Sequence, residues 1–252
     1  MTATGFEPIA ASLHAALTDW FADRDRAAAE ATIATNSSLV EERVQPLIAM
    51  LERRGVASLH GRRVVDLGCG FGAVAVYLAW RGAEVHGIDA NPTVLQVGNA
   101  VAAEHGLLVR LDQGRMEALP AGDGEYDVAL MNNTLCYLVG AEERHAALSE
   151  AARVLTPGGV LVLRDLNAVH PVDHFTGLPL LPALPPRTAS RVAAWRGRSR
   201  PAVRAVSPRL MRSTILSAGF TSVEHEASRT GVAAKVLRPV ARYQHFTARP
   251  VQ

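Results

Sequence analysis

The residues with the clearest chemical potential form a glycine-rich stretch, VVDLGCGFGA, at residues 64–73. Gly68, Gly70 and Gly72 stand at alternate positions, directly after an apolar run and Asp66. Glycines in such a turn let the backbone approach a ligand closely and direct its amides toward it. Because a carboxylate beside the turn would repel a pyrophosphate, the stretch predicts a nucleotide-like cofactor that carries positive charge.

The glycine spacing separates two classes of cofactor. Dinucleotide enzymes carry GxGxxG, and their pyrophosphate lies at the helix N-terminus. Here the spacing is GxGxG with Ala73 next, which together with Asp66 favours a cofactor carrying an ammonium and a sulfonium. Asp89 ends the following apolar run, in VHGIDANP, where a carboxylate can accept two hydrogen bonds from ribose hydroxyls. Dinucleotide enzymes share that carboxylate, so Asp89 alone does not discriminate.

Strands and helices alternate around these residues. Asn91 and Pro92 form an N-cap and first-turn pair for one of the helices. The alternation indicates an α/β fold with a parallel sheet covered on both faces, which binds ligands at the carboxyl ends of its strands. Apolar runs predict strands at 64–67, 84–88, 107–111, 126–131 and 160–163, with helices at 72–81, 92–105 and 142–155.

Two helices are expected before this core. Residues 8–30 place apolar side chains about one helical turn apart. A second helix is predicted to start at Ser38, whose spacing to Glu41 fits a capping box. Pro46 is expected either to bend that helix or to move its start.

Residues 168–206 interrupt the alternation. They are rich in proline, and their leucines and aromatics favour an ordered cap over a free linker. Ser207 and Pro208 are expected to begin a last helix that Gly219 ends. Two further strands are predicted near 221–227 and 241–248.

Composition excludes several classes of function. The formal charge of +2 over 252 residues argues for neither nucleic acid nor an anionic membrane. Cys69 and Cys136 have the spacing of neither a disulfide framework nor a zinc site, and no convincing cluster names a metal site. The N-terminus lacks the pattern of a signal peptide, and no apolar run is long enough to span a membrane. We therefore expect a cytoplasmic location.

Four stretches in order carry a resemblance to a known family. DLGCGFG, GIDANP, EYDVALMNNTLCYL and RVLTPGGVLVL are similar to the motifs of the class I S-adenosylmethionine-dependent methyltransferases. The similarity covers roughly residues 62–166 and the closing LSAGFTSVE. It implies S-adenosyl-L-methionine as the cofactor and a Rossmann-like, mostly parallel sheet of seven strands whose last strand is antiparallel.

The resemblance also implies places for the cofactor. The glycine loop, Cys69 included, would lie beside the methionine part, and the cysteine itself is interpreted as a small packing residue. Asp89 would bind the ribose diol, and Ala90 would lie near the adenine. Asn132 and Asn133 would lie under the cofactor and face the substrate. Arg43 would reach the cofactor carboxylate, as arginines before the first motif do in some relatives; the alternative is a solvated helix face.

Two positions depart from the family pattern. Arg115 stands where the family often has an aspartate that takes the adenine amino group, and arginine cannot accept a hydrogen bond. Adenine recognition would then depend on the backbone at Met116, on Glu117, or on stacking of Arg115. Cys136 stands where many small-molecule members carry histidine, which removes one familiar base.

Candidate catalytic residues follow the fourth and fifth predicted strands. His170 and His174, with Asp173 adjacent to the second histidine, could form a base and its orienting group. The alternative is that they are surface or cap residues. Tyr137 is placed to shape the acceptor pocket, unless it is a core aromatic. Trp20 and Phe21 could close the site, although their helical spacing favours packing.

An arginine cluster lies in the excursion, and three interpretations of it are open. It is a solvated loop, a contact for an anionic substrate, or a contact for RNA. Prolines and alanines dilute its charge, and Trp195 is its one interleaved aromatic. The cluster comprises Arg187, Arg191, Arg196, Arg198, Arg200 and Arg204.

These features favour methyl transfer to a small-molecule acceptor, with an oxygen acceptor ahead of nitrogen or carbon. We expect a monomer or homodimer that binds no nucleic acid and no membrane. Two alternatives are a non-methylating enzyme that retains the cofactor, such as a cyclase, and a non-catalytic cofactor-binding subunit. The expected organisation is a helical cap at 1–60, a cofactor-binding core at 61–167, a substrate cap at 168–206, and a helix with strands completing the sheet at 207–252.

Overall fold

A single sheet of seven strands organises the molecule. The computed structural model describes residues 5–23, 26–226 and 243–251. The strand order is β3-β2-β1-β4-β5-β7-β6, in which β1 to β5 run parallel and β7 is antiparallel to both of its neighbours. This confirms the predicted sheet. The strands are β1 (Arg63–Leu67), β2 (Glu84–Asp89), β3 (Val109–Gln113), β4 (Tyr126–Asn132), β5 (Leu155–Leu166), β6 (Phe220–Glu226) and β7 (Tyr243–Pro250).

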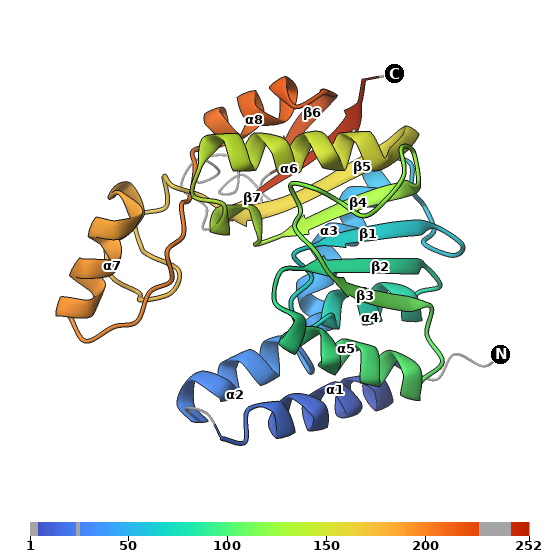
Figure 1. Ribbon diagram of the computed structural model, residues 1–252, viewed down its shortest axis with the longest axis horizontal. Coiled ribbons are helices and arrows are strands. Elements are labelled where there is room, and N and C mark those ends of the chain that lie inside the picture. The colour runs from blue at the N-terminus through green and yellow to red at the C-terminus, as the bar shows by residue number, and fades with distance from the viewer. Residues whose placement is uncertain (1–4, 24–25, 227–242, 252) are drawn as a thin grey trace.

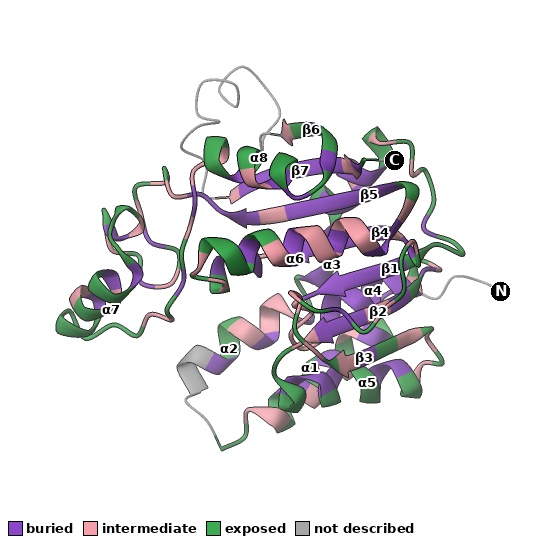
Figure 2. Cartoon of the chain, turned by 45° about the horizontal axis from the view of Figure 1, so that its top comes forward, coloured by how far each residue is buried: buried purple, intermediate pink, exposed green. Residues whose placement is uncertain are grey.

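Helices cover both faces of the sheet (Figure 1). Along β1, Val64 packs with α3 and α4, whereas its neighbour Val65 packs with α6 and α8. Because successive strand residues point to opposite faces, both layers bury apolar side chains, as a covered parallel sheet requires. Figure 2 shows the strands largely buried. The helices in these layers are α3 (Val40–Arg53), α4 (Ala73–Trp80), α5 (Pro92–Glu104), α6 (Ala141–Val154) and α8 (Pro208–Ser217).

The N-terminal helices differ from the prediction in two ways. The prediction of a single helix over 8–30 is wrong. The structure has two helices there, α1 (Glu7–Trp20), which ends in a turn, and α2 (Arg26–Thr35). The capping box at Ser38 is also wrong, since α3 begins after Leu39 without a side-chain cap. The Ser38 hydroxyl instead donates to the Ala34 carbonyl oxygen at 3.5 Å, at the end of α2. Pro46 lies inside α3 and does not move its start.

The excursion between β5 and α8 is ordered over 168–206, as expected. It holds a short 3-10 helix, η2 (Leu181–Ala183), and α7 (Pro186–Trp195), which share a small apolar cluster of their own. A buried ion pair, Asp173 Oδ2 to Arg200 Nε at 2.8 Å, joins its two halves. In Figure 1, α7 lies on the same side of the molecule as α2.

The end of the chain forms the predicted helix and two strands. Ser207 caps α8, its hydroxyl accepting a hydrogen bond from the Leu210 amide. The strands expected near 221–227 and 241–248 correspond to β6 and β7. Residues 227, 241 and 242 of those predictions lie outside the described residues.

Candidate functional site

A cavity of about 630 Å³ opens at the carboxyl edge of the parallel strands. Its volume falls within the usual range for small-molecule sites, roughly 300–1,000 Å³. The position is the one at which open α/β sheets bind ligands. The chemistry-bearing residues among its lining are Asn36, Arg43, Asp66, Cys69, Asp89, Asn91, Arg115, Glu117, Asn132, Asn133, Thr134 and Tyr137.

The glycine loop forms the floor of this cavity. Gly68 and Gly70 have φ values of 74° and 55°, which favour glycine. A Cβ on Gly68 would lie 1.7 Å from Thr134 Oγ1, so no side chain fits there. At Gly70 a Cβ would meet nothing within 4 Å, so the space above that backbone is open. The loop therefore leaves bare backbone facing a cavity, as a close-fitting ligand requires.

Asp89 is fixed at the base of the loop. Its Oδ2 accepts the Gly70 amide at 2.9 Å, and its Oδ1 accepts the Asn91 amide at 2.9 Å. Asn91 caps α5 in turn, its Oδ1 accepting from the Thr93 amide at 3.1 Å. Each carboxylate oxygen retains a further lone pair. Asp89 is thus held rigidly at the end of β2 with acceptor capacity to spare.

Asp66 is a buried carboxylate with an unused oxygen. It is 2% exposed, and its Oδ2 has no hydrogen-bond partner among the described residues. Burial raises the pKa of Asp66 to about 7, against the opposing charge of Arg43. Such an orphaned group is costly unless a ligand completes it. A cationic ligand group in the cavity would supply that partner.

Arg43 provides the complementary positive charge. Its Nη1 donates to Asn36 Oδ1 at 3.3 Å, while its buried Nε has no hydrogen-bond partner in the part of the chain that the structure describes. Burial and the charge of Arg164 lower the pKa of Arg43 to about 10, so the guanidinium stays charged at neutral pH. The cavity thus contains an incompletely satisfied cation and an incompletely satisfied anion, which suits the zwitterionic amino acid part of S-adenosylmethionine.

Behind Asn132 lies a polar chain that the sequence analysis did not single out. Arg164 Nη1 donates to Asn132 Oδ1 at 3.2 Å, and the Arg164 guanidinium lies 3.8 Å from the ring centre of Tyr243. The Tyr243 hydroxyl lies 3.2 Å from Nδ1 of His174. The sequence signal that could have identified Arg164 is the pair of charged residues, Arg164 and Asp165, near the end of an apolar run in LVLRDL.

The opposite end of the cavity is lined by Ala90, Met116 and Glu117, with Arg115. Arg115 Nη2 contacts Glu117 Oε1 at 2.6 Å, so the Glu117 carboxylate neutralises the arginine that departs from the family pattern. The Arg115 side chain is otherwise well exposed. The role of each residue toward adenine stays a prediction.

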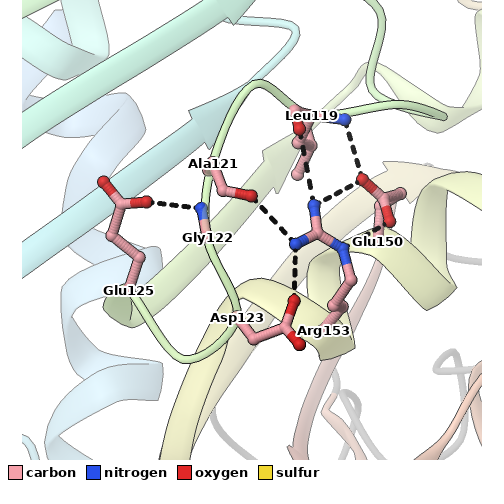
Figure 3. A network of polar contacts seen from close by, with 7 residues as sticks. All are labelled: Leu119, Ala121, Gly122, Asp123, Glu125, Glu150 and Arg153. Atoms are coloured by element: carbon pink, nitrogen blue, oxygen red, sulfur yellow. Dashed lines mark hydrogen bonds and ion pairs between the residues drawn. The ribbon is translucent and has the colours of Figure 1, made fainter.

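A network around Arg153 holds the connection from β3 to β4 (Figure 3). Arg153, on α6, donates to the Ala121 carbonyl at 2.9 Å and to Asp123 Oδ1 at 2.8 Å. It also pairs with Glu150, whose Oε2 accepts the Leu119 amide at 2.8 Å. This connection also contains the cavity-lining residues Met116 and Glu117. By holding the connection, α6 fixes the part of the cavity wall that these two residues form.

The predicted catalytic residues do not all reach the cavity. Tyr137 lines it with a half-exposed side chain, whereas His170 and His174 are not among its described lining residues. Asp173, the predicted orienting group, is engaged within the excursion. Its carboxylate accepts hydrogen bonds from Arg200 Nε at 2.8 Å and Thr176 Oγ1 at 2.9 Å. The base-and-orienter arrangement stays a prediction.

Trp20 and Phe21 pack rather than line the cavity. Trp20 contacts the ring of Phe71 in the glycine loop, with ring centres 4.9 Å apart, and its Nε1 donates to the Thr93 carbonyl at 3.2 Å. Phe21 contacts the same ring at 5.8 Å. Phe71 itself lines the cavity. The N-terminal cap therefore supports the loop from behind.

The arginine cluster of the excursion is not uniform. Arg200 is buried in its ion pair with Asp173 and is structural. Arg196 lies 5.0 Å from the ring centre of Trp195, which is 79% exposed. Across the described ranges, no group of three or more His, Cys, Asp or Glu side chains could hold a metal ion. Within the same ranges, no helix is both long and apolar enough to cross a membrane.

Comparisons with known proteins agree with this geometry. A family model described as a methyltransferase domain matches residues 64–159. The demethylmenaquinone methyltransferase of Thermus thermophilus is 32% identical over 69% of this chain and 80% of that protein. The 2-heptyl-1-hydroxyquinolin-4(1H)-one methyltransferase of Mycobacteroides abscessus is 34% identical over 52% of this chain and 60% of that protein. The chain spans about half the length of the first curated relatives it matches.

Among solved structures, the CcbJ methyltransferase from Streptomyces caelestis superimposes with a TM-score of 0.61 at 24% identity, over 79% of this chain and 88% of that one. At this identity the likeness shows the fold. Together with the relatives, it places the chain in the class I S-adenosylmethionine-dependent methyltransferases. S-adenosyl-L-methionine is accordingly the cofactor.

Proposed function

We propose that this protein transfers the methyl group of S-adenosylmethionine to a small-molecule acceptor, and that the acceptor atom is oxygen. The observation that carries the proposal is the combination of two incompletely satisfied charges, buried Asp66 and partly buried Arg43, with an open glycine loop in one cavity. An oxygen acceptor is supported by relatives named as ubiquinone biosynthesis O-methyltransferases.

Each cofactor group has a matching group on the chain. Asp66 would accept the ammonium, Arg43 would donate to the carboxylate, and Asp89 would accept from the ribose hydroxyls. The backbone of the glycine loop would approach the methionine part. The adenine would lie among Ala90, Met116 and Glu117, and Asn132 would lie beneath the cofactor.

The chain's part in the chemistry is mainly positioning. When bound, the cofactor supplies an electrophilic methyl carbon on a sulfonium. The protein then contributes proximity and alignment, which can account for much of the rate of such a displacement. Tyr137 and Asn133 would shape the acceptor side of the cavity, and Thr134 closes the loop against β4 through its contact at Gly68.

Calorimetric titration tests the cofactor assignment. We expect S-adenosylmethionine and S-adenosylhomocysteine to bind and NADH not to bind. Asp89→Ala should weaken binding by roughly 1–3 kcal/mol, because the hydrogen bonds it loses are charge-assisted. Asp19→Ala, an exposed aspartate on α1, is the matched control and should bind as the wild type does.

An acceptor screen followed by mass spectrometry tests the transfer. Product heavier by one methyl group, formed with S-adenosylhomocysteine, supports the proposal. Turnover that leaves the cofactor intact would indicate a non-methylating enzyme instead. Stoichiometric cofactor binding without product from any acceptor would indicate a non-catalytic subunit.

A further inference from the structure

The cavity offers the acceptor few groups that could take a proton. A general base needs a pKa near the working pH and must reach the proton that it removes. None of the described lining residues is histidine or lysine. The titratable lining residues are Arg43, Asp66, Cys69, Asp89, Arg115, Glu117 and Tyr137.

Each uncharged candidate stays protonated at neutral pH. Burial, with the charges of Cys136, Asp165 and Asp89, raises the pKa of Tyr137 to about 12. Burial likewise raises the pKa of the Cys69 thiol well above its usual value. A protonated phenol or thiol cannot accept the acceptor's proton, so neither side chain is a base here.

The carboxylates are already engaged. Asp89 accepts two backbone amides, and Glu117 is paired with Arg115. Asp66 lies beneath the glycine loop and in the proposed function receives the cofactor ammonium. No carboxylate therefore remains for the acceptor among the described lining residues.

Two partly buried guanidiniums bear on this part of the cavity: Arg43 lines it, and Arg164 lies behind the lining residue Asn132. Arg43 contacts the neutral amide of Asn36, and Arg164 contacts the amide of Asn132 and the ring of Tyr243. Among the described residues, neither forms a salt bridge, although the charge of Asp66 acts on Arg43 and that of Asp165 acts on Arg164. The groups that face Arg164 from β7 are Tyr243 and His245, and burial and the charge of Arg164 lower the pKa of His245 to about 4, so it is neutral.

One carboxylate from the cofactor would neutralise one of these two cations. The second guanidinium and the sulfonium would then leave the acceptor side of the cavity positive. Such a field favours an anion and disfavours a protonated amine. Arg164 also fixes Asn132 through its amide oxygen, which leaves the amide N–H groups as donors.

We propose that the acceptor is an oxygen acid that enters the site already ionised, as a phenolate, enolate or carboxylate, attracted by the charge of Arg164 and the sulfonium rather than deprotonated by a protein base. This inference rests on the proposed function. The acceptor's oxygen anion forms the new bond to the methyl carbon while the carbon–sulfur bond breaks and its electron pair goes to sulfur. The proton leaves to solvent before binding, so no protein group gains or loses one.

The first experiment reads the ionisation state of a bound acid directly. Nitrophenols of graded size are titrated in pH against the protein loaded with S-adenosylhomocysteine, and phenolate absorbance is recorded. The expected result is an apparent pKa at least one unit below that of the free phenol, which means at least tenfold tighter binding of the anion. A panel in which no ionised acid binds better than its neutral form overturns the proposal.

Variants separate charge from structure in the same assay. Arg164→Gln should return the bound pKa toward the free value, whereas Arg164→Lys, which keeps the charge, should retain most of the shift. Arg209→Gln, an exposed arginine on α8, is the matched control and should leave the shift intact. A shift that survives Arg164→Gln in folded protein contradicts the role given to Arg164.

A second experiment uses the pH dependence of kcat/KM for phenols of similar shape and different pKa. If the acceptor ionises in solution, the midpoint should follow the acceptor pKa one for one. With S-adenosylmethionine saturating at every pH, a midpoint fixed for all acceptors, and abolished by Tyr137→Phe or His174→Gln, would identify a protein base and refute the proposal. Failure of S-adenosylmethionine to bind in calorimetry would instead refute the proposed function.

Discussion

Asp66 shows how a single residue can serve binding at the expense of folding. Its carboxylate is buried, one of its oxygens has no hydrogen-bond partner within the described ranges, and its pKa is raised to about 7, chiefly by burial. The unfolded chain ionises this group near 3.8. A residue kept in such an environment is expected to gain its partner from a ligand.

The first prediction concerns the pH dependence of cofactor affinity. A cationic ligand group binds the ionised form of Asp66, so a proton must leave before binding below pH 7. We expect affinity for S-adenosylmethionine to fall by about tenfold for each pH unit below 7 and to level off above it. Asp66→Asn should weaken binding at pH 8 and remove this dependence, as measured by calorimetry at pH 6, 7 and 8. An unchanged slope in the variant would show that another group titrates.

The second prediction concerns the free energy of unfolding of the cofactor-free protein. Because the folded pKa of Asp66 lies above the unfolded one, the folded state binds the extra proton, and Asp66 lowers stability as pH rises from about 4 to about 7. At pH 8, the Asp66→Asn variant should therefore unfold at a higher denaturant concentration than the wild type, with a free energy of unfolding larger by roughly 1–4 kcal/mol. At pH 4 the gain should be small. A variant destabilised at pH 8 would contradict this account.

At the scale of elements, two connections beside the site are held by arginines. Arg153 joins α6 to the β3–β4 connection, and Arg200 joins the two halves of the excursion. They differ in burial, because about a third of the Arg153 side chain is exposed while Arg200 is 3% exposed. The same kind of contact should therefore have different energetic consequences.

Removing Arg153 should loosen one wall of the cavity without unfolding the core. Arg153→Ala loses four accepting groups but leaves Glu150 in reach of water, so we expect a cost of about 1–2 kcal/mol. Hydrogen exchange should accelerate over residues 118–125 and little elsewhere. The exposed Arg209→Ala is the control, and an equal effect from it would show that the network of Figure 3 is not responsible.

Breaking the Asp173–Arg200 pair should be more severe. Burial opposes the charge of Asp173, but the hydrogen bonds from Arg200 and Thr176 outweigh it and lower the pKa of Asp173. Asp173→Ala leaves Arg200 buried and unpaired, which typically costs about 3–5 kcal/mol. Limited proteolysis should then cut within 168–206 while the core remains folded. Because the folded state lowers the pKa of Asp173, the ion pair stabilises the fold where Asp173 is ionised. This stabilisation should be lost as pH falls through the lowered pKa.

Local sequence patterns predicted those elements best whose position depends on a single local interaction. The alternating core and the Asn91 cap followed from apolar periodicity and from a side chain beside its own helix. The start of α3 was mispredicted because Ser38 lies close to both the end of α2 and the start of α3, and the sequence does not say at which helix its hydroxyl bonds. The Arg164–Asn132 contact depends on strand register between β4 and β5, which no local pattern encodes.

At the scale of the whole molecule, the cavity belongs to the sheet and the N-terminal cap. Its described lining residues come from the α2–α3 region, the glycine loop and the carboxyl ends of β1 to β4, and none comes from 168–206. The part of the excursion around α7 has an apolar cluster of its own, whereas Phe175 and Val203 belong to a cluster with Cys136, Leu166 and Tyr243 of the core. Cofactor binding should therefore stabilise the elements that line the cavity and leave residues 168–206 unaffected until an acceptor binds.

The last prediction follows from that division. A ligand at one hundred times its Kd stabilises the state that binds it by about 2.7 kcal/mol. With S-adenosylmethionine alone, hydrogen exchange should slow over the glycine loop and, through the contact of Trp20 with Phe71, over α1, while residues 168–206 exchange as before. Adding a methyl acceptor's product together with S-adenosylhomocysteine should slow exchange in 168–206 as well, if that segment covers the acceptor.

Trp20→Ala should uncouple α1 from the loop, and protection of α1 that persists in this variant would assign the coupling to other contacts. Protection of 168–206 by the cofactor alone would mean that the excursion closes before the acceptor enters, and the order of binding would then be reversed.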